Sequence, residues 1–170
     1  TDYVAGRLDA KALKGRSAGF GIYQQRDDRT MMRVRRVGGR VTADDLRHAA
    51  ALLRAHGGSH VHLTTRQDLQ LHGIPAAHVT AALAACEAVG FHFRGGGGDT
   101  FRNTCVSAFS GLHADSVFDV LPYARALSRA FAAFDPAYGL PRTLKIALAD
   151  RPADAVLAQP NDLGFLAKTV

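Results

Sequence analysis

Cysteine is scarce in this sequence. The 170-residue chain contains two cysteines, Cys86 and Cys105. Their spacing matches neither a zinc site nor an iron–sulfur cradle, and no His-Glu-x-x-His or other local metal pattern is present. Cys86 follows Val79 and Leu83 on an apolar helical stripe, so we interpret it as a core residue. The sequence therefore predicts no metal ligands within the chain and a reducing, cytoplasmic location.

Long apolar runs are also missing. No run reaches the length of a membrane span, and no signal peptide is recognisable, so we expect no membrane partner. Hydrophobic residues nevertheless make up 47% of the chain and charged residues 21%, which is typical of a globular protein rather than a disordered one. The length suits one sizeable domain or two small ones.

Acidic residues are in deficit. Fifteen Asp and Glu stand against 21 Lys and Arg, which gives a formal net charge of +6. Most of the basic residues are arginines, whose planar guanidinium suits bidentate recognition of carboxylates, phosphates or sulfur oxyanions. The composition therefore indicates an anionic partner.

Three segments alternate between apolar and polar residues, as half-buried strands do. They cover residues 31–37, 60–64 and 68–72. In the last two, Val61, Leu63, Leu69 and Leu71 are expected to face the core. The opposite face is expected to carry the polar residues Arg33, Arg35, His62, Thr64, Gln70 and His72. This face is either an ordinary solvated surface or a ligand surface, and its Arg, His, Thr and Gln content favours a ligand.

Two helices separate and follow these strands. The first begins with Thr42-Ala-Asp-Asp45, which is close to a capping box, and ends at Gly57-Gly58. The second opens at Pro75 and stops at Gly90, before a short last strand at residues 91–93. The order β-α-β-β-α-β predicts an α+β protein with a ferredoxin-like split βαβ sandwich. In that fold both helices cover one sheet face, so the polar face is open to a ligand.

Composition shifts divide the chain into three parts. Residues 1–28 are basic and poorly periodic and are interpreted as an amino-terminal arm lying on another surface. Residues 29–94 are expected to form the ferredoxin-like domain, and the glycine run at 95–98 is a natural boundary. Residues 99–170 are expected to begin an αβ domain that is left incomplete, with a helix from Asp119 and strands at 143–148 and 163–167.

Four blocks occur in a fixed order along the chain. They are Arg33-x-Arg35-x-x-Gly-Gly39, the Leu-Thr-Thr-Arg-Gln-x-x-Gln-x-His-Gly block of residues 63–73, Asp99-x-x-Arg-Asn103, and Leu140-Pro-Arg-x-x-Lys145. Each block alone is weak, but together they resemble the amino-terminal part of the sirohaem-dependent nitrite and sulfite reductases. The resemblance covers residues 20–170.

The resemblance implies an oxidoreductase that carries out the six-electron reduction of sulfite or nitrite. Such enzymes hold sirohaem, an iron tetrapyrrole fringed with carboxylates, together with a 4Fe-4S cluster. The cluster cysteines belong to the carboxy-terminal half of the family, so we expect this chain to be inactive alone. It would need that half or a second subunit, and an electron donor such as ferredoxin or a flavoprotein. No nucleic-acid partner is expected.

The resemblance also implies roles for individual residues. Arg33, Arg102 and Lys145 would be catalytic, with Lys145 as the proton donor and the arginines beside the oxyanion. The residues implied to bind the cofactor are Thr64, Thr65, Arg66, Gln70, His72, Asn103 and Arg142.

One position departs from the family pattern. Members usually carry two lysines separated by one residue after Leu-Pro-Arg, and here Thr143 occupies the first of these positions. Precorrin-3B synthases of cobalamin biosynthesis also relax this part of the pattern. A precorrin-3B synthase-like enzyme part and a non-catalytic tetrapyrrole-binding module are therefore the alternatives.

Overall fold

The computed structural model describes residues 5–7 and 9–169, and it divides the chain into two compact units. The first unit consists of residues 1–35, 41–64 and 68–98. The second unit consists of residues 36–40, 65–67 and 99–170. Each unit is described by itself.

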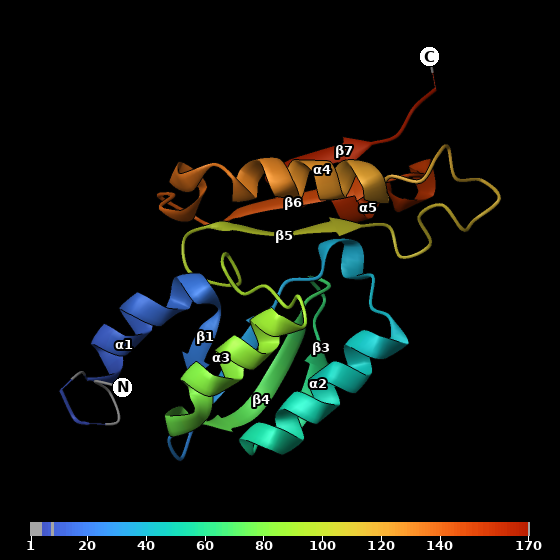
Figure 1. The fold of residues 1–170 in the computed structure, drawn as a ribbon. Helices are drawn as coiled ribbons and strands as arrows, with labels where there is room; N and C mark the ends of the chain where they lie inside the picture. The colour runs from blue at the N-terminus through green and yellow to red at the C-terminus, as the bar shows by residue number, and fades with distance from the viewer. Residues whose placement is uncertain (1–4, 8, 170) are drawn as a thin grey trace. The chain divides into compact units, whose positions relative to one another are not determined.

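The first unit is built on an antiparallel sheet with the order β1-β2-β4-β3 (Figure 1). Its elements are α1 (Ala10–Ser17), β1 (Ile22–Gln24), β2 (Arg29–Val34), α2 (Ala43–His56), β3 (His60–Leu63), β4 (Leu69–Pro75) and α3 (Val79–Ala88). Helices α2 and α3 cover one face, where Met32, Leu71 and Cys86 belong to the same buried cluster. The predicted α+β, ferredoxin-like fold is confirmed.

Helix α2 begins where the sequence predicts it. The Thr42 hydroxyl accepts a hydrogen bond from the Asp45 N–H, and the Asp45 carboxylate accepts one from the Thr42 N–H. This reciprocal capping box satisfies two backbone donors that have no partner inside the helix. The helix ends at Gly57, whose left-handed conformation (φ 72°) closes the last turn.

The fourth strand of this sheet differs from the prediction. Residues 91–93 contribute only a single bridge, between His92 and Arg35, whereas β1 pairs with β2 along Ile22–Gln24. The residues interpreted as an arm lying on another surface thus contain an edge strand and helix α1, while residues 1–4 and 8 lie outside the described part. The segment was missed because three residues are too short to show a period of two.

Leu63 also differs from the prediction, since its side chain is 66% exposed. Leu63 is the last residue of the edge strand β3, which has a neighbouring strand on one side only. Val61, Leu69 and Leu71 pack in or against the core as predicted.

The second unit contains a parallel sheet with the order β5-β6-β7. Its elements are β5 (Phe101–Val106), α4 (Leu121–Ala132), β6 (Leu144–Ala149), α5 (Ala155–Ala158) and β7 (Leu163–Leu166). Helix α4 packs on the face that carries Ile146 and Leu148, and α5 packs on the face that carries Ala147 and Ala149. The sequence did not predict β5 or α5, because β5 mixes polar and apolar residues and α5 has a single turn.

None of the helices in the described residues is both long and apolar enough to cross a membrane.

Candidate functional site

The open face of the first sheet carries a row of polar side chains that the strand register brings together. Arg33 of β2 lies opposite Gln70 of β4, and Gln70 lies opposite His62 of β3. One step along, His72 lies opposite His60. With two residues from the amino-terminal segment, these side chains form what we call the polar sheet face: Tyr23, Gln25, Arg33, His60, His62, Gln70 and His72.

Arg33 is half-buried and held on several sides. Its Nη1 donates to the Gly96 carbonyl at 3.0 Å, and its guanidinium carbon lies 5.6 Å from the centre of the Tyr23 ring. The Gln70 side-chain amide lies 2.7 Å from Nη2 and 3.1 Å from Nε of Arg33. Within the described part of the chain no carboxylate contacts Arg33, so its charge remains available to an anionic ligand.

The three histidines of the polar sheet face are in ring contact. His60 and His72 stack with centroids 4.6 Å apart, and His62 meets His72 edge-on at 6.2 Å. The pKa of His72 is lowered from its ordinary value, first by burial and then by the positive fields of His60, His62 and Arg33. The neutral ring is therefore favoured at neutral pH.

A basic hollow of about 490 Å³ adjoins these rings. Its lining includes His60, His72, Arg26 and Arg29, and it contains no acidic residue. Arg29 is fixed at this edge because its Nη1 donates to the carbonyls of Gly57 and Gly73. This end of the sheet is thus electropositive and suited to anions.

The two threonines predicted to bind a cofactor, Thr64 and Thr65, differ in burial and in their contacts. The Thr64 hydroxyl accepts a hydrogen bond from the Asp68 N–H at 3.0 Å, which helps to close the β3–β4 turn. Thr65 is exposed. Thr64 therefore has a local structural contact in addition to its predicted role.

In the second unit, Asn103 is the centre of a different arrangement. Its side chain is completely buried, and its amide nitrogen lies 2.9, 3.0 and 3.1 Å from the carbonyl oxygens of Arg36, Arg66 and Gln67. We call these residues, together with Cys105, the Asn103 cluster. Within the described residues the Asn103 side-chain oxygen has no hydrogen-bond partner.

An irregularity in β5 places Asn103 there. Three residue steps from Phe101 to Thr104 span the same interval as two steps from Leu144 to Ile146 in β6. Such a bulge redirects side chains, and it coincides with Arg102 and Asn103.

Arg66 and Gln67 complete the cluster. Arg66 donates to the Asn161 side-chain oxygen at 2.7 Å and to the Asn103 carbonyl at 2.9 Å. Gln67 has a φ of 60° and makes paired hydrogen bonds to the backbone of Val106. The Cys105 thiol lies 3.4 Å from the Arg66 carbonyl. The loop at residues 65–67 is therefore held by side-chain and backbone hydrogen bonds to β5 and Asn161.

The remaining predicted residues lie on the second sheet or beside it. Arg102 is half-buried in β5, and Lys145 in β6 has an exposed side chain while its N–H donates to Asp162 at 2.7 Å. Arg142 precedes β6 and is exposed. The structure thus gathers Arg33, Gln70 and His72 in one unit and Arg66, Arg102 and Asn103 in the other.

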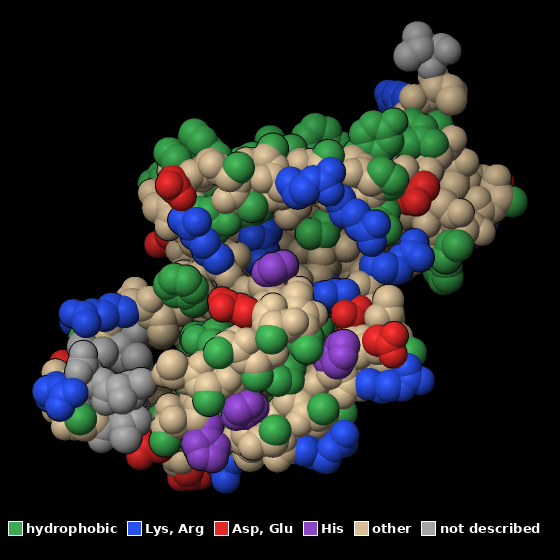
Figure 2. Space-filling view, in the orientation of Figure 1, with side chains coloured by type: hydrophobic (Ala, Val, Ile, Leu, Met, Phe, Trp, Pro, Cys, Tyr) green, Lys and Arg blue, Asp and Glu red, His purple; other side chains and the backbone are tan. Residues whose placement is uncertain are grey.

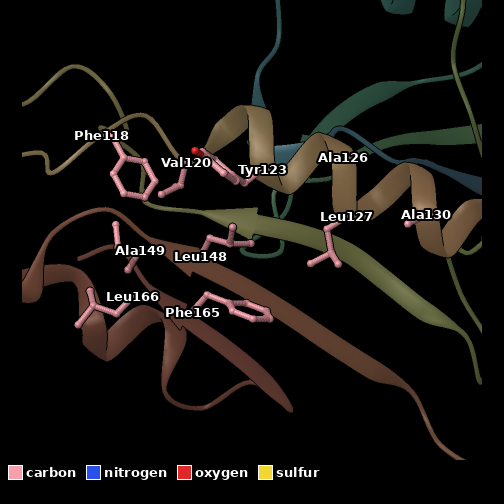
Figure 3. A pocket seen from close by; sticks show the side chains of 11 residues that line it. Phe118, Val120, Tyr123, Ala126, Leu127, Ala130, Leu148, Ala149, Phe165 and Leu166 are labelled. Carbon is pink, nitrogen blue, oxygen red and sulfur yellow. The ribbon is translucent and has the colours of Figure 1, made fainter. Parts of the chain in front are cut away.

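A groove of about 540 Å³ opens between α4 and β7 (Figure 3). Tyr123 and Leu127 of the helix and Phe165 of the strand line it, and no charged side chain does. Hydrophobic side chains also gather on the surface over α4 and β7 (Figure 2). The side chains that line this groove are therefore almost entirely apolar, with the Tyr123 phenol as the exception.

No group of three or more His, Cys, Asp or Glu residues among residues 5–7 and 9–169 is placed to hold a metal ion. Cys86 is buried in the first core, where burial and then Glu87 raise its pKa to about 12. A thiol in that state is a poor metal ligand because the thiolate is the binding form.

Sequence reasoning missed Tyr23, Gln25 and Gln67. The first two belong to the segment interpreted as an arm, so their approach to Arg33 and His72 depended on the unrecognised strand β1. Gln67 stands inside the recognised Leu-Thr-Thr-Arg-Gln block, and nothing in that block indicated that its side chain binds the backbone of Val106.

The chain is an α+β protein whose first unit carries a cationic sheet face and whose second unit holds Asn103 against three backbone carbonyls. Two family models match it: the nitrite/sulfite reductase ferredoxin-like half domain over residues 23–89, and the nitrite and sulphite reductase 4Fe-4S domain over residues 97–170. The chain belongs to the nitrite and sulfite reductase family.

Individual relatives agree. The chain is 30% identical, over 94% of its length, to the sulfite reductase [NADPH] hemoprotein beta-component of Nitrobacter hamburgensis, of which it covers 33%. It is 29% identical, over 73% of its length, to the chloroplastic ferredoxin–nitrite reductase of Oryza sativa subsp. japonica, of which it covers 22%. The chain thus spans a third or less of these relatives.

Solved structures resemble the chain as well. The Mycobacterium tuberculosis NirA protein matches with a TM-score of 0.81 and 26% identity, over 95% of this chain and 32% of the other. Dissimilatory sulfite reductase I matches with a TM-score of 0.63 over 75% of this chain, and its 14% identity supports the fold alone.

Proposed function

We propose that this chain is the amino-terminal part of a sirohaem-dependent reductase of sulfite or nitrite, and that it supplies cationic groups for cofactor and oxyanion. The observation that carries the proposal is Arg33, a half-buried guanidinium held by neutral groups on an open sheet face. The names of the relatives support sulfite and nitrite as the substrates, and one relative's name supports ferredoxin as the electron donor.

The donor set suits a carboxylate-rich tetrapyrrole. Gln70, His72 and Arg33 offer donors on one face of the first unit, and Arg66, Arg102 and Arg142 add cations in the second. When bound, sirohaem supplies the iron that binds the substrate and receives electrons. The residues proposed to hold its carboxylates and ring edge are Thr64, Thr65, Arg66, Gln70, His72, Asn103 and Arg142.

The chain does not suit the iron–sulfur cluster. A 4Fe-4S cluster requires four cysteine thiolates, and this chain has two cysteines, of which Cys86 is buried with a pKa of about 12. The cluster ligands must come from the part of the relatives that this chain does not cover.

The proposed chemistry of the chain is electrostatic and acid–base. Arg33 and Arg102 would bind the oxyanion and offset the charge that develops as its bonds to oxygen break. Each departing oxygen atom leaves as water and so requires two protons. The exposed Lys145 ammonium would donate protons, and water would restore them. Thr143 leaves Lys145 as the single lysine of this motif.

The test of the oxyanion residues uses the complete enzyme. Arg33→Ala and Arg102→Ala are each expected to lower kcat/KM by at least about tenfold. Arg54→Ala, in helix α2 on the covered side of the sheet, is the matched control and should leave turnover unchanged. Normal turnover in both the Arg33 and Arg102 variants would contradict the oxyanion assignment.

The test of the cofactor surface uses this chain. A visible spectrum recorded while sirohaem is added should show a shifted, saturable Soret band, and Gln70→Ala with Arg66→Ala should weaken it. If the folded chain shows no such band, the proposal that these residues bind sirohaem in this chain alone is contradicted.

A further inference from the structure

The polar sheet face contains a chain of hydrogen bonds with a donor at each end. At one end the Gly73 N–H donates to the Gln25 side-chain oxygen at 3.0 Å, and the Gln25 nitrogen lies 2.9 Å from His72 Nδ1. His72 Nε2 lies 3.1 Å from the Gln70 amide. At the other end, the Gln70 amide lies 2.7 Å from Nη2 and 3.1 Å from Nε of Arg33.

This chain has one donor too many. Within this chain of contacts, Gln25, neutral His72 and Gln70 each donate one hydrogen bond on one side and accept one on the other. None of the three can accept on both sides. Gly73 N–H and the Arg33 guanidinium both donate toward the middle. Whichever way the three groups are turned, one contact must therefore bring two donors together.

The place of this conflict follows from the strength of the donors. If the Gln70 oxygen faces Arg33, it accepts two charge-assisted hydrogen bonds, which are about twice as strong as neutral ones. Gln70 then donates to His72 Nε2, and His72 Nδ1–H donates to the Gln25 oxygen. This arrangement requires the Gln25 amide to turn from its orientation in the structure, where its oxygen accepts from the Gly73 N–H. The conflict then lies at the weaker end, where the Gln25 nitrogen faces the Gly73 N–H.

An anion at Arg33 removes the conflict. If Arg33 donates to an external oxygen, Gln70 is free to turn its oxygen toward His72. Every contact from Gly73 N–H to Gln70 then pairs a donor with an acceptor, and His72 carries its proton on Nε2.

We propose that Arg33, Gln70, His72 and Gln25 form a hydrogen-bond relay, in which occupation of Arg33 by a carboxylate or an oxyanion shifts the His72 proton from Nδ1 to Nε2. Gln70 and Gln25 are positioning residues in this relay. The choice of anion rests on the proposed function, whereas the relay rests on the first unit alone.

Protonation of His72 opposes the relay. The imidazolium would donate from both nitrogens and raise the number of donor–donor contacts from one to two. The titratable and charged groups that face His72 act in the same direction: His60 and His62 from β3, Arg33 and Arg29 from β2, and Arg26 from the β1–β2 turn. The lowered pKa of His72 agrees with this arrangement.

The test is to read the His72 tautomer by nitrogen-15 NMR of the full chain at pH 8, where the ring is neutral. The free protein is expected in the Nδ1–H form. Sodium sulfite and sodium acetate, each compared with chloride at equal ionic strength, are expected to shift it to Nε2–H. A response to sulfite alone identifies an oxyanion site, and a response to acetate identifies a carboxylate site.

Two variants test the relay without any ligand. Arg33→Met removes one terminal donor and should give the Nε2–H form in the free protein, while Arg35→Met in the same segment should not. Gln25→Glu supplies an acceptor to both Gly73 and His72, so His72 should keep its proton on Nδ1. The affinity of the chain for the anion should then fall by about fivefold. Gln24→Glu controls for the added charge.

Three results would overturn the relay. They are an Nε2–H tautomer in the free wild-type chain, an Arg33→Met variant that folds yet keeps Nδ1–H, and a chain in which neither anion changes the His72 signals. If Arg33→Ala lowers turnover in the complete enzyme but neither anion changes the His72 signals of this chain, the proposed function stands and the relay is contradicted. A working relay in a chain that does not bind sirohaem would do the reverse.

Discussion

The polar sheet face and the Asn103 cluster use similar residue types in opposite ways. On the sheet face, Gln70 and His72 bond mainly to other side chains, and their neighbours are titratable. In the Asn103 cluster, Asn103 and Gln67 bond to backbone carbonyls and N–H groups. Side chains that bond to side chains can exchange partners when a ligand arrives, whereas side chains that bond to backbone fix the path of a loop. The first arrangement suits recognition, and the second suits support.

The largest expected effect contrasts the two amides. Asn103→Ala should lower the free energy of unfolding by about 2–3 kcal/mol, because it leaves three backbone carbonyls without this donor in a buried place. Gln70→Ala should cost less than about 1 kcal/mol, because Arg33 and His72 stay near solvent. Urea unfolding measures both. Equal losses of unfolding free energy in the two variants would contradict the distinction between the Asn103 cluster and the polar sheet face.

A buried carboxylate in the second unit gives the next effect. Burial alone would raise the pKa of Asp150, but hydrogen bonds from Ser116, Ser107 and Gly111 outweigh it, so the pKa is lowered from 3.8. The stabilisation is therefore complete above pH 3.8 and is lost as the pH falls through the lower folded-state value.

Asp150→Asn should accordingly cost about 1–2 kcal/mol at pH 7, and the difference from wild type should shrink below about pH 4. Unfolding measured at a series of pH values tests this. Asp115→Asn, the same change at an exposed site nearby, is the control and should show no such dependence. A constant difference down to pH 2 would contradict the sign of the shift.

Two arginines of the second unit differ in the same way, because Arg66 makes hydrogen bonds within the unit and Arg142 is exposed. Arg66→Ala should cost about 1 kcal/mol because it removes hydrogen bonds to Asn161 and Asn103. Arg142→Ala should stay within about 0.5 kcal/mol because the side chain is exposed. Chemical denaturation of both variants provides the measurement, and a larger loss at Arg142 would count against this assignment.

The smallest effect concerns the two thiols. Cys86 is buried with a pKa of about 12, so it should resist a thiol reagent at pH 8, whereas half-buried Cys105 should react first. Labelling of the native chain should therefore stop near one thiol, and Cys105→Ser should abolish that fast phase. Two fast phases of equal size would contradict the burial of Cys86.

The sequence predicted the regular parts well. The Thr42 capping box, the alternation of β4 and the apolar stripe of α3 are local patterns, because caps and periods are set by neighbouring residues. The ordered motif blocks identified the family, which the family models then confirmed. The roles given to Arg33, Arg102 and Lys145 stay predictions.

The sequence by itself determined the α+β fold, the capped start of helix α2 and the cationic character of the open face, because these depend on composition and short-range periodicity. Only the tertiary structure decided that Gln25 reaches His72 and that Asn103 binds three carbonyls. Those contacts join residues 36 to 67 positions apart. A hydrogen bond depends on distances of tenths of an ångström that sheet pairing and a bulge set, and no local pattern encodes them.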